Sequence, residues 1–566
     1  MGLSKPVVQG CHMSEKERTR ILILGGGFAG VYTAMYLDKL LRSEPDVEIS
    51  LVSRENYFVF QPMLAEVISG NIGLLDTVSP IHRLVPRCRL YIREIESISL
   101  PKRQVTLGPG FWPQSLVLEF DHLVLALGTV TDFRGITGLH QHALPFKNLA
   151  DAVRLRNHLI HVLNEAEIES NSERRQQLLT FVVAGGGFSG VEVAAELNDF
   201  VRHMAKQFRS FSAADIRVVL VHSGKQILER EVGQKLSAYA QRLLQGRGVE
   251  LCLENRLKTA TPDAAILSSG VRIPTKTLVS TVPSSSHPLI DTLDVSKEGG
   301  RIVVDGHLQV IGSENIWALG DTARVPNAAD NGHCPPTAQH AIRQAKTLAH
   351  NIAARIHGRE LRIFRFPGLG KMGALGHHSA VAELFNRIRI SGFPAWLLWR
   401  TVYWWKLPGF DRKLKVGFSW LLDLLIPPEA VQLRIDGGPA LAQLHFEPGE
   451  VVFRKGDLGD SLYIILQGEA EVILETESAE PSQSSVERVQ RLATLGAGEY
   501  FGEIALLKQK TRSATVRCTK ALDLLVLPQG QFQALTTNLP DFKSSFELVM
   551  DLRMKREAQE KQFIDK

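Results

Sequence analysis

ILILGGGFAG at residues 21–30 and FVVAGGGFSG at residues 181–190 are two copies of one pattern in the same chain. In each copy a short apolar run meets Gly-x-Gly-x-x-Gly and continues into helix-forming sequence. Such a run is typical of a buried parallel strand. One copy would be a weak signal, but two copies predict two dinucleotide-binding units.

The glycines of each copy have separate structural roles. Gly25 permits a tight turn, Gly27 lets the backbone approach a pyrophosphate, and Gly30 lets the next helix pack closely. The backbone N–H groups at the start of that helix, predicted from Val31 to Leu41, would face the phosphates. In the second copy the same roles fall to Gly185, Gly187 and Gly190, before a helix predicted from Val191.

The acidic residue that usually binds a ribose hydroxyl is missing from both units. It is expected at the end of the next strand, where VEISLVS (47–53) and IRVVLVHS (216–223) place Ser53 and His222. Ser53 can still form a hydrogen bond with a ribose. His222 removes the carboxylate that would repel a 2′-phosphate, so the sequence leaves both NADH and NADPH open.

Composition agrees with a multidomain globular enzyme. The 566 residues suggest three or four domains of about 150 residues. A net charge of +5 does not by itself indicate nucleic acid, so we expect no nucleic-acid partner. The five cysteines form no C-x-x-C pair and no metal-ligand spacing, which predicts no metal and argues against a disulfide reductase.

Five further segments, in order along the chain, carry a family resemblance. They are ENYFVFQPMLAEV (55–67), the stretch from FDHLVLALGTV onward (120–159), NIWALGDTA (315–323), PPTAQHAIRQA (335–345) and SGFPAWLLWR (391–400). With the two glycine motifs, they resemble type II NADH:quinone oxidoreductases. These are single-subunit flavoproteins that reduce membrane quinone without pumping protons.

The resemblance implies an α/β fold with two nested Rossmann-like domains. The FAD-binding domain would comprise residues 20–145 and 290–385, and the NAD(P)H-binding domain residues 146–289. FAD would be the cofactor and NADH the donor. The residues implied to bind these two cofactors are Gly25, Gly27, Phe28, Ala29, Gly30, Ser53, Asn56, Asp321, Ala338, Gly185, Gly187, Gly190 and His222.

Three residues are implied to be catalytic. Glu192 matches the family's acid near the flavin–nicotinamide contact, although a carboxylate in the first turn of a helix is also favoured by the helix dipole. Gln339 would face flavin and quinone. The family's second glutamine is Arg343 here, with Gln344 one position later. His378, beside His377, would relay a proton or lie on the surface.

Residues 386–430 are predicted to anchor the enzyme to a membrane. Five of the seven tryptophans lie between 396 and 420, and residues 384–420 hold seven Lys or Arg and one acid. Pro408 interrupts the apolar run well before the roughly 20 residues of a membrane span. The pattern suits amphipathic helices on the bilayer surface, through residues 392–420. The alternatives are a homodimer interface and a core helix. The implied location is the cytoplasmic face of the inner membrane.

The character of the chain changes after Pro427-Pro428. Residues 436–550 resemble a β-roll cyclic-nucleotide-binding domain, followed by a charged tail at 551–566. In FGEIALLKQKTRSATV (501–516) the resemblance implies a cyclic nucleotide bound by Gly502, Glu503, Arg512 and Ser513, with cAMP and cGMP both open. Because this domain follows the anchor segment directly, we expect it to act on quinone entry or lipid binding.

Two other functions fit parts of the sequence. Oxidation of another donor, such as sulfide, into quinone would need redox cysteines beside the flavin, and Cys334 is the one candidate in the sequence. The chain could instead be a flavin-dependent redox sensor that acts on a partner. Turnover with quinone analogues separates these functions from NADH:quinone oxidoreduction.

Overall fold

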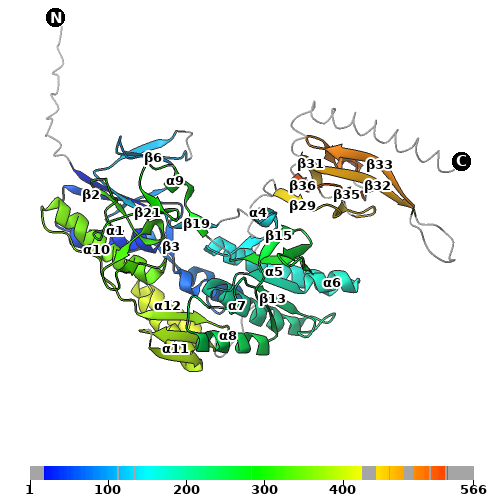
Figure 1. Cartoon of the computed structure of the whole chain (residues 1–566), viewed down its shortest axis with the longest axis horizontal. Helices are drawn as coiled ribbons and strands as arrows, with labels where there is room; N and C mark the ends of the chain where they lie inside the picture. Colours follow the sequence, from blue (N-terminus) through cyan, green and yellow to red (C-terminus); the bar gives the residue numbers. More distant parts are fainter. Residues whose placement is uncertain are drawn as a thin grey trace, which may run out of the picture.

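Two five-stranded parallel sheets dominate the structure (Figure 1). The computed structural model describes residues 18–110, 114–131, 136–281, 284–385, 387–422, 442–457, 459, 461–476, 488–508, 511–528 and 532. The first sheet has the order β22-β9-β1-β2-β5 and comprises Ile316–Ala318, His122–Leu125, Thr19–Leu24, Val47–Ser53 and Arg89–Ile92. Strand β1 is central because its apolar residues Ile21–Leu24 are at most 2% exposed.

The second sheet repeats the first. Its order is β11-β18-β12-β13-β14, and its strands are Leu144–Pro145, Thr277–Ser280, Thr180–Ala184, Arg217–Val221 and Val249–Cys252. Each neighbouring pair is parallel. The strand before the glycine motif is therefore central in both sheets, so the sequence repeat corresponds to a structural repeat.

The helices after the glycine motifs begin earlier than the sequence predicted. Helix α1 spans Phe28–Leu40 and α7 spans Phe188–Met204, three residues before the predicted starts. The reason is that the middle glycine is the N-cap, with extended backbone at Gly27 and Gly187. The third glycine then lies inside the first helical turn, where Gly30 faces the carbonyl of Gly25.

The second sheet and its helices interrupt the first unit. Two antiparallel strands, β10 (Thr129–Thr131) and β19 (Ser284–Ser286), lie at the crossing points between the units. The chain then returns through β22 to the first sheet, and α10 (Ala338–Ile356) packs against α1. Other helices and strands of the two units include α5 (Leu149–Ile168), α6 (Ser172–Leu178), α8 (Gln234–Gly246), β6 (Ile95–Ser99), β7 (Gln104–Leu107) and β8 (Leu116–Glu119).

A small antiparallel sheet and two helices form the edge that the sequence predicted to be an anchor. Strands β26 (Gly370–Ala374), β27 (Ala380–Leu384) and β28 (Ile388–Gly392) lead into α11 (Phe393–Lys406) and α12 (Phe410–Leu422), with Pro408 between the helices. Among the described residues, no helix combines the length and the apolar character needed to cross a bilayer. The residues 423–430 of the predicted anchor lie outside the described ranges.

The tryptophans of this edge divide between the interior and the surface. Trp396, Trp399 and Trp420 are buried, and the first two lie on the inner face of α11. They pack inward because α11 covers β27 and β28, and α12 packs against α11. The outer face instead exposes Phe393, Leu397, Trp405, Leu414 and Phe418, each more than half exposed.

The C-terminal part is a β-roll of two four-stranded antiparallel sheets. One has the order β29-β36-β31-β34 (Ala442–Phe446, Leu522–Pro528, Ser461–Gln467, Tyr500–Phe501), and the other β30-β35-β32-β33 (Val451–Phe453, Thr515–Cys518, Glu469–Thr476, Arg488–Gly496). The six-residue helix α13 spans Glu503–Lys508. The predicted tail, residues 551–566, lies outside the described residues.

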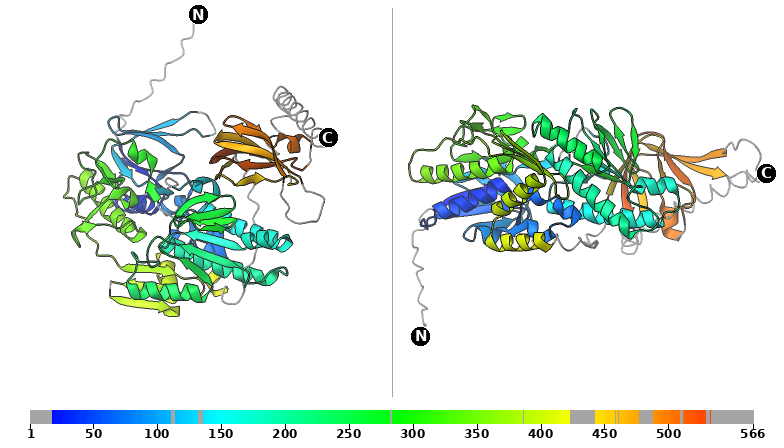
Figure 2. Two further views of the ribbon diagram at one scale, coloured as in Figure 1. Left: turned by 45° about the vertical axis from the view of Figure 1, so that its right-hand side comes forward. Right: turned by 90° about the horizontal axis from the view of Figure 1, so that it is seen from below.

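The β-roll contacts the second unit, although the chain reaches it from α12. The backbone N–H of His445 in β29 donates to His142 Nε2 at 2.9 Å, at the end of α4 (Leu139–His142). Arg272 in β17 (Arg272–Pro274) pairs with Glu450 at 2.8 Å. Both figures of the whole molecule place the β-roll beside this unit, away from α11 and α12 (Figures 1 and 2). The described contacts of the β-roll thus include α4 and β17 of the second unit.

Candidate functional site

A groove runs from the first glycine motif to the junction of the two units. Its outer part is lined by Gly25, Gly27, Ser53 and His287, and its inner part by Lys147, Glu192, Asp321 and Ala338. Phe28, Gln61 and Thr129 line both parts, so the two are continuous. An elongated dinucleotide such as FAD has this form, with an adenosine end and a flavin end.

The glycine motif leaves room for a pyrophosphate at one position. A β-carbon at Gly27 would meet no protein atom within 4 Å. At Gly25 it would collide with the carbonyl of Ala126, and the backbone there has φ +117°, which favours glycine. The open space at Gly27 lies at the N-terminus of α1, where free N–H groups favour an anion. These residues fit the phosphates of FAD.

At the inner end, a carboxyl and an ammonium group lie in one pocket. Burial raises the pKa of Asp321, while Arg301 and Lys147 oppose that rise. Burial lowers the pKa of Lys147 to about 8, and its Nζ donates to Thr129 Oγ1 at 2.8 Å. The turn that carries Asp321 is fixed by Gln344, whose Oε1 accepts from Gly320 N at 2.8 Å. Gln344 therefore supports the turn, and Lys147 is a site residue that was not predicted.

The second glycine motif ends in the same pocket. Phe188 and Glu192, both in the first turns of α7, line it together with Phe28 from α1. Glu192 Oε1 accepts from Ala374 N at 3.0 Å. Burial raises the pKa of Glu192 to about 8, which keeps the carboxyl protonated at neutral pH. Two helix N-termini and one neutral carboxylic acid thus converge on one space.

The remaining predicted residues divide into those at the site and those beside it. Ala29 is buried in the first turn of α1, and the His222 ring lies against Gly186. Asn56 is exposed. The side-chain amide of Gln339 is bonded to the backbone at both atoms. Its Oε1 accepts from Leu369 N at 3.2 Å, and its Nε2 donates to the carbonyl of Gly370 at 3.1 Å. His378 packs edge-on against Trp396, with ring centroids 4.8 Å apart, and does not line the pocket.

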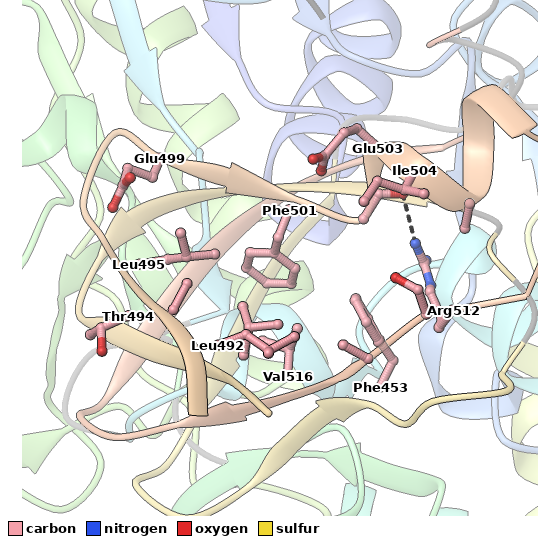
Figure 3. A pocket seen from close by; sticks show the side chains of 16 residues that line it. Phe453, Leu492, Thr494, Leu495, Glu499, Phe501, Glu503, Ile504, Arg512 and Val516 are labelled. Atoms are coloured by element: carbon pink, nitrogen blue, oxygen red, sulfur yellow. Dashed lines mark hydrogen bonds between the residues drawn. The ribbon is translucent and has the colours of Figure 1, made fainter. Parts of the chain in front are cut away.

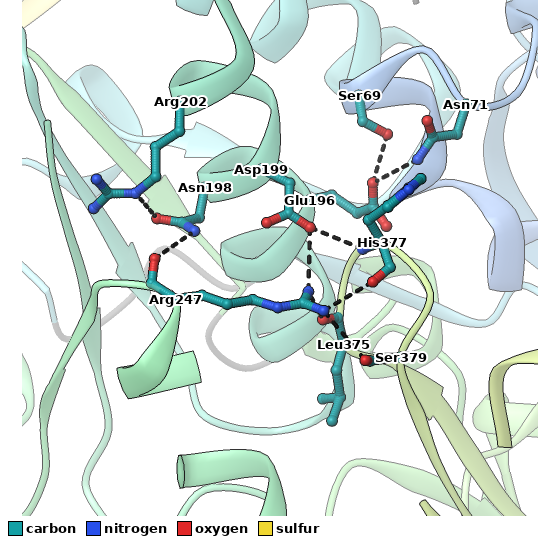
Figure 4. A network of polar contacts seen from close by, with 10 residues as sticks. All are labelled: Ser69, Asn71, Glu196, Asn198, Asp199, Arg202, Arg247, Leu375, His377 and Ser379. Carbon is teal, nitrogen blue, oxygen red and sulfur yellow. Dashed lines mark hydrogen bonds and ion pairs between the residues drawn. The ribbon is translucent and has the colours of Figure 1, made fainter. Parts of the chain in front are cut away.

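Behind Glu192, α7 carries a second buried carboxyl that the sequence analysis missed (Figure 4). Glu196 Oε2 accepts from Ser69 Oγ at 2.5 Å and Asn71 Nδ2 at 3.3 Å. Burial raises the pKa of Glu196, and nearby Glu66 raises it further. The spacing Glu192–Glu196 places both on one helix face, which is a signal the sequence did contain.

A cation beside these buried carboxyls comes from the predicted anchor. Arg400 of α11 is 9% exposed and lies 3.6 Å from Glu66 Oε1. Its guanidinium is held between Trp396 and Trp420, at 4.3 and 4.6 Å from the ring centroids. Burial raises the pKa of Glu66, and Arg400 opposes that rise. Helix α11 is therefore fixed to the interior by a buried ion pair.

The turn that carries His377 and His378 is also tied to α7 (Figure 4). Asp199 accepts from the backbone N–H of His377 at 2.8 Å and pairs with Arg247 at 3.3 Å. Arg247 donates to the carbonyls of Leu375 and His377 at 2.7 and 2.8 Å. Within the described residues, no group of His, Cys, Asp or Glu is arranged to hold a metal ion.

The β-roll has its own pocket, and all four predicted nucleotide-binding residues line it (Figure 3). They are Gly502, Glu503, Arg512 and Ser513. Arg512 donates to the carbonyls of Gly502 and Ser461, each at 2.9 Å, and its guanidinium lies 4.2 Å from the centre of the Phe453 ring. Arg512 and Glu503 are 3% and 1% exposed, so both charges are held inside the domain.

The fold and the groove define a flavin oxidoreductase with two dinucleotide-binding units. The model of the pyridine nucleotide-disulphide oxidoreductase family matches residues 19–345, and that of the cyclic nucleotide-binding domain matches residues 443–538. Demethylphylloquinone reductase NdbB of Synechocystis is 32% identical over 411 residues, which are 71% of this chain and 96% of that protein. Type II NADH:quinone oxidoreductase Ndh of Mycobacterium tuberculosis is 30% identical over 458 residues, 76% of this chain and 93% of that protein.

The chain belongs to the type II NADH:quinone oxidoreductase family and carries a C-terminal cyclic nucleotide-binding domain. Among solved structures, NDH2 of Plasmodium falciparum in complex with NADH superposes with a TM-score of 0.68 at 19% identity, over 73% of this chain and all of that one. The sulfide:quinone oxidoreductase of Aquifex aeolicus gives a TM-score of 0.56 at 18% identity. These two likenesses concern the fold alone.

Proposed function

We propose that this chain oxidises NADH, reduces membrane quinone through FAD, and responds to a cyclic nucleotide. The redox part of the proposal is supported by one observation, that the two glycine motifs end at the same pocket. Phe28 and Phe188, equivalent residues of the repeat, line this pocket together with Glu192. Two dinucleotides that bind the N-termini of α1 and α7 would meet end to end there.

Each group of residues then has a definite task. Bound FAD supplies hydride acceptance from the nicotinamide and electron transfer to quinone. The chain orients the two rings, with Gly27 admitting one pyrophosphate and Gly187 the other. Lys147 and Asp321 fix the inner end of the flavin site, and Glu192 holds a proton at Oε1 or Oε2 beside it.

The test is steady-state oxidation of NADH by a short-chain quinone with the purified, yellow protein. We expect NADH to bleach the flavin and quinone to restore its colour. A protein that binds no FAD, or whose flavin NADH does not reduce, would refute the proposal. Sulfide in place of NADH provides the comparison donor. The sulfide reaction lacks support here because Cys334, the candidate cysteine, is buried and does not line the pocket.

Quinone reduction should depend on the protonation of Glu192. Its pKa is raised to about 8, so the carboxyl carries a proton below that pH and loses it above. We expect the rate of reoxidation of the reduced flavin by quinone to fall as pH rises through about 8. Glu192→Gln should be slower at neutral pH and lack this fall, which stopped-flow absorbance can measure. The same fall in the variant would assign it to another group.

The outer face of α11 and α12 is proposed to lie on the cytoplasmic face of the inner membrane. Trp405 and Phe418 are 71% and 63% exposed, with Lys413 and Lys415 on the same pair of helices. Replacing both aromatic residues by serine should lower binding to anionic vesicles by roughly tenfold or more, because each large apolar side chain contributes on the order of 1 kcal/mol at an interface. Sedimentation with vesicles measures this binding.

The control for this prediction is Ile168→Ser on α5. Ile168 is 75% exposed, so the change removes a comparable apolar side chain elsewhere on the surface. Vesicle binding should be unchanged in the Ile168→Ser variant. In the wild type, binding should weaken as the salt concentration rises. Equal binding by the double variant and the wild type would show that another surface meets the lipid.

The regulatory part of the proposal rests on the place where the β-roll docks. Helix α4 lies between two segments that line the redox pocket: Thr129 and Thr131 precede it, and Phe146 and Lys147 follow it. His142, at the end of α4, contacts β29, and β29 pairs with β36 and through it with β31, whose Ser461 accepts from Arg512. A movement of Arg512 on nucleotide binding could therefore be transmitted through these strands and α4 to the two segments that line the redox pocket.

We therefore expect the cyclic nucleotide to alter flavin reduction by NADH. A ligand changes activity only if it binds two conformations unequally. Stopped-flow flavin reduction with and without cAMP or cGMP measures the effect, and His142→Ala should abolish it while calorimetry still detects nucleotide binding. Regulation of quinone reduction alone, with flavin reduction unchanged, would contradict the route through α4.

A further inference from the structure

The nicotinamide-nucleotide unit has no carboxylate at the position where ribose is usually bound. Strand β13 ends at Val221, and the next residue is His222, whose ring lies against Gly186 in the glycine motif. In units of this kind an acidic residue at this position accepts the ribose 2′-hydroxyl and repels a 2′-phosphate. Whether the chain selects NADH therefore depends on what else surrounds His222.

The loop that follows β13 folds back onto the glycine motif. The backbone N–H of Leu228 donates to the carbonyl of Gly186 at 2.8 Å, and the carbonyl of Leu228 accepts from Glu231 N and Val232 N at 3.1 and 3.0 Å. Leu228 is completely buried and has φ +55°, a left-handed conformation that is costly for leucine. Such a conformation persists only where its surroundings impose it. The loop is thus held in one position over the nucleotide-binding turn.

The side chain of the next residue, Glu229, lies close to the His222 ring. Glu229 Oε2 and His222 Nε2 lie 2.6 and 2.7 Å from the point that a β-carbon on Gly224 would occupy. The Glu229 carboxylate and the His222 imidazole therefore lie next to each other, beside Gly224. The Glu229 side chain is exposed, so its carboxylate is accessible to a ligand. A carboxylate and an imidazole together offer acceptors for two vicinal ribose hydroxyls.

We infer that Glu229 is the residue that selects NADH over NADPH, and that it supplies from the loop the acceptor missing at the end of β13. The inference rests on the proposed function, since it concerns the donor site of that reaction. Its carboxylate would accept the ribose 2′-hydroxyl of NADH in a charge-assisted hydrogen bond. The same negative charge repels the 2′-phosphate of NADPH.

The experiment compares NADH and NADPH as reductants of the flavin in the FAD-loaded full-length protein. For the wild type we expect kcat/KM for NADH to exceed that for NADPH. Glu229→Gln removes the charge at nearly constant size, and Glu229→Ala removes the side chain. Each should lower the NADH:NADPH ratio by about tenfold or more, the factor that one lost charge-assisted hydrogen bond produces. Equilibrium binding of NAD⁺ and NADP⁺ should shift in the same sense.

Glu231→Gln is the matched control. Its carboxylate also lies on the glycine motif, with Oε1 2.9 Å from the point that a β-carbon on Gly187 would occupy. Gly187 is expected to face the pyrophosphate, which NADH and NADPH share. Loss of this charge should raise the affinity for both nucleotides and leave their ratio unchanged. Circular dichroism and flavin content show whether each variant is folded.

The possible results distinguish a failure of the proposed function from a failure of the Glu229 assignment. If neither nucleotide reduces the wild-type flavin, the proposed function fails. If NADH reduces it but the NADH:NADPH ratio is the same in the wild type and both Glu229 variants, the assignment of Glu229 alone is overturned. A wild type that prefers NADPH, or a ratio that changes equally in Glu231→Gln, overturns that assignment as well.

Discussion

Replacement of Gly27 by valine should leave the protein folded and remove its yellow colour. A β-carbon at this position meets no protein atom within 4 Å, so the chain itself tolerates a side chain there. The space it would fill is the one proposed for the FAD pyrophosphate, at the N-terminus of α1. We expect flavin content, measured as absorbance per polypeptide after gel filtration, to fall below about one tenth of the wild-type value, a loss of at least roughly 1.4 kcal/mol.

The internal repeat supplies the control for this variant. Gly187 occupies the same position in the second unit, as the N-cap of α7. Gly187→Val should therefore remain yellow, while reduction of its flavin by NADH is lost. Retention of full flavin content by Gly27→Val would refute the assignment of the first motif. Loss of flavin from Gly187→Val would reverse the assignment of the two units.

Replacement of Arg512 by alanine should abolish cyclic-nucleotide binding. Arg512 lines the pocket of the β-roll and is held there by two backbone carbonyls and the ring of Phe453. A guanidinium in that position can form charge-assisted hydrogen bonds with a cyclic phosphate. Loss of two such bonds corresponds to a weakening of about 100-fold or more. Isothermal calorimetry with cAMP and cGMP measures the affinity, and flavin reduction without nucleotide should not change.

Two further variants distinguish binding from folding. Arg512→Lys keeps a cation in the pocket but loses the planar fork, so it should retain the fold and bind weakly. Arg517→Ala removes a neighbouring arginine whose side chain is 41% exposed and pairs with Glu471 at 2.6 Å. Arg517→Ala should bind like the wild type. Wild-type affinity in Arg512→Ala, or no binding of either nucleotide to the wild type, would remove the sensor role.

The sequence predicted the parts of the fold that depend on local patterns. Both sheets have the strand before the glycine motif at their centre, because a fully apolar run such as Ile21–Leu24 must be covered on both sides. The four residues of the cyclic-nucleotide cassette also meet in one pocket. These predictions depended on short segments whose residues are constrained by their neighbours in sequence.

Contacts between distant segments could not be predicted from the sequence. In α11, Trp396 and Trp399 face inward while Trp405 is exposed, because the inner side of a helix is decided by what packs against it, here β27 and β28. The contact between the β-roll and α4 joins segments that are far apart in sequence. Glu66 and Arg400 lie far apart in sequence and form one buried pair. The spacing of residues along the sequence does not indicate an ion pair of this kind.

The burial of Arg400 decides how the proposed membrane-facing surface of α11 could be removed by design. Removing α11 would leave Glu66 in the interior without its cation, and breaking a buried ion pair in this way costs about 3–5 kcal/mol. Truncation is therefore the wrong route to such a form. Helix α11 should be kept whole, with its inner residues untouched, and only its outward side chains replaced by polar ones. Preparations designed in this way would keep the buried Glu66–Arg400 pair and lose the exposed apolar side chains of α11.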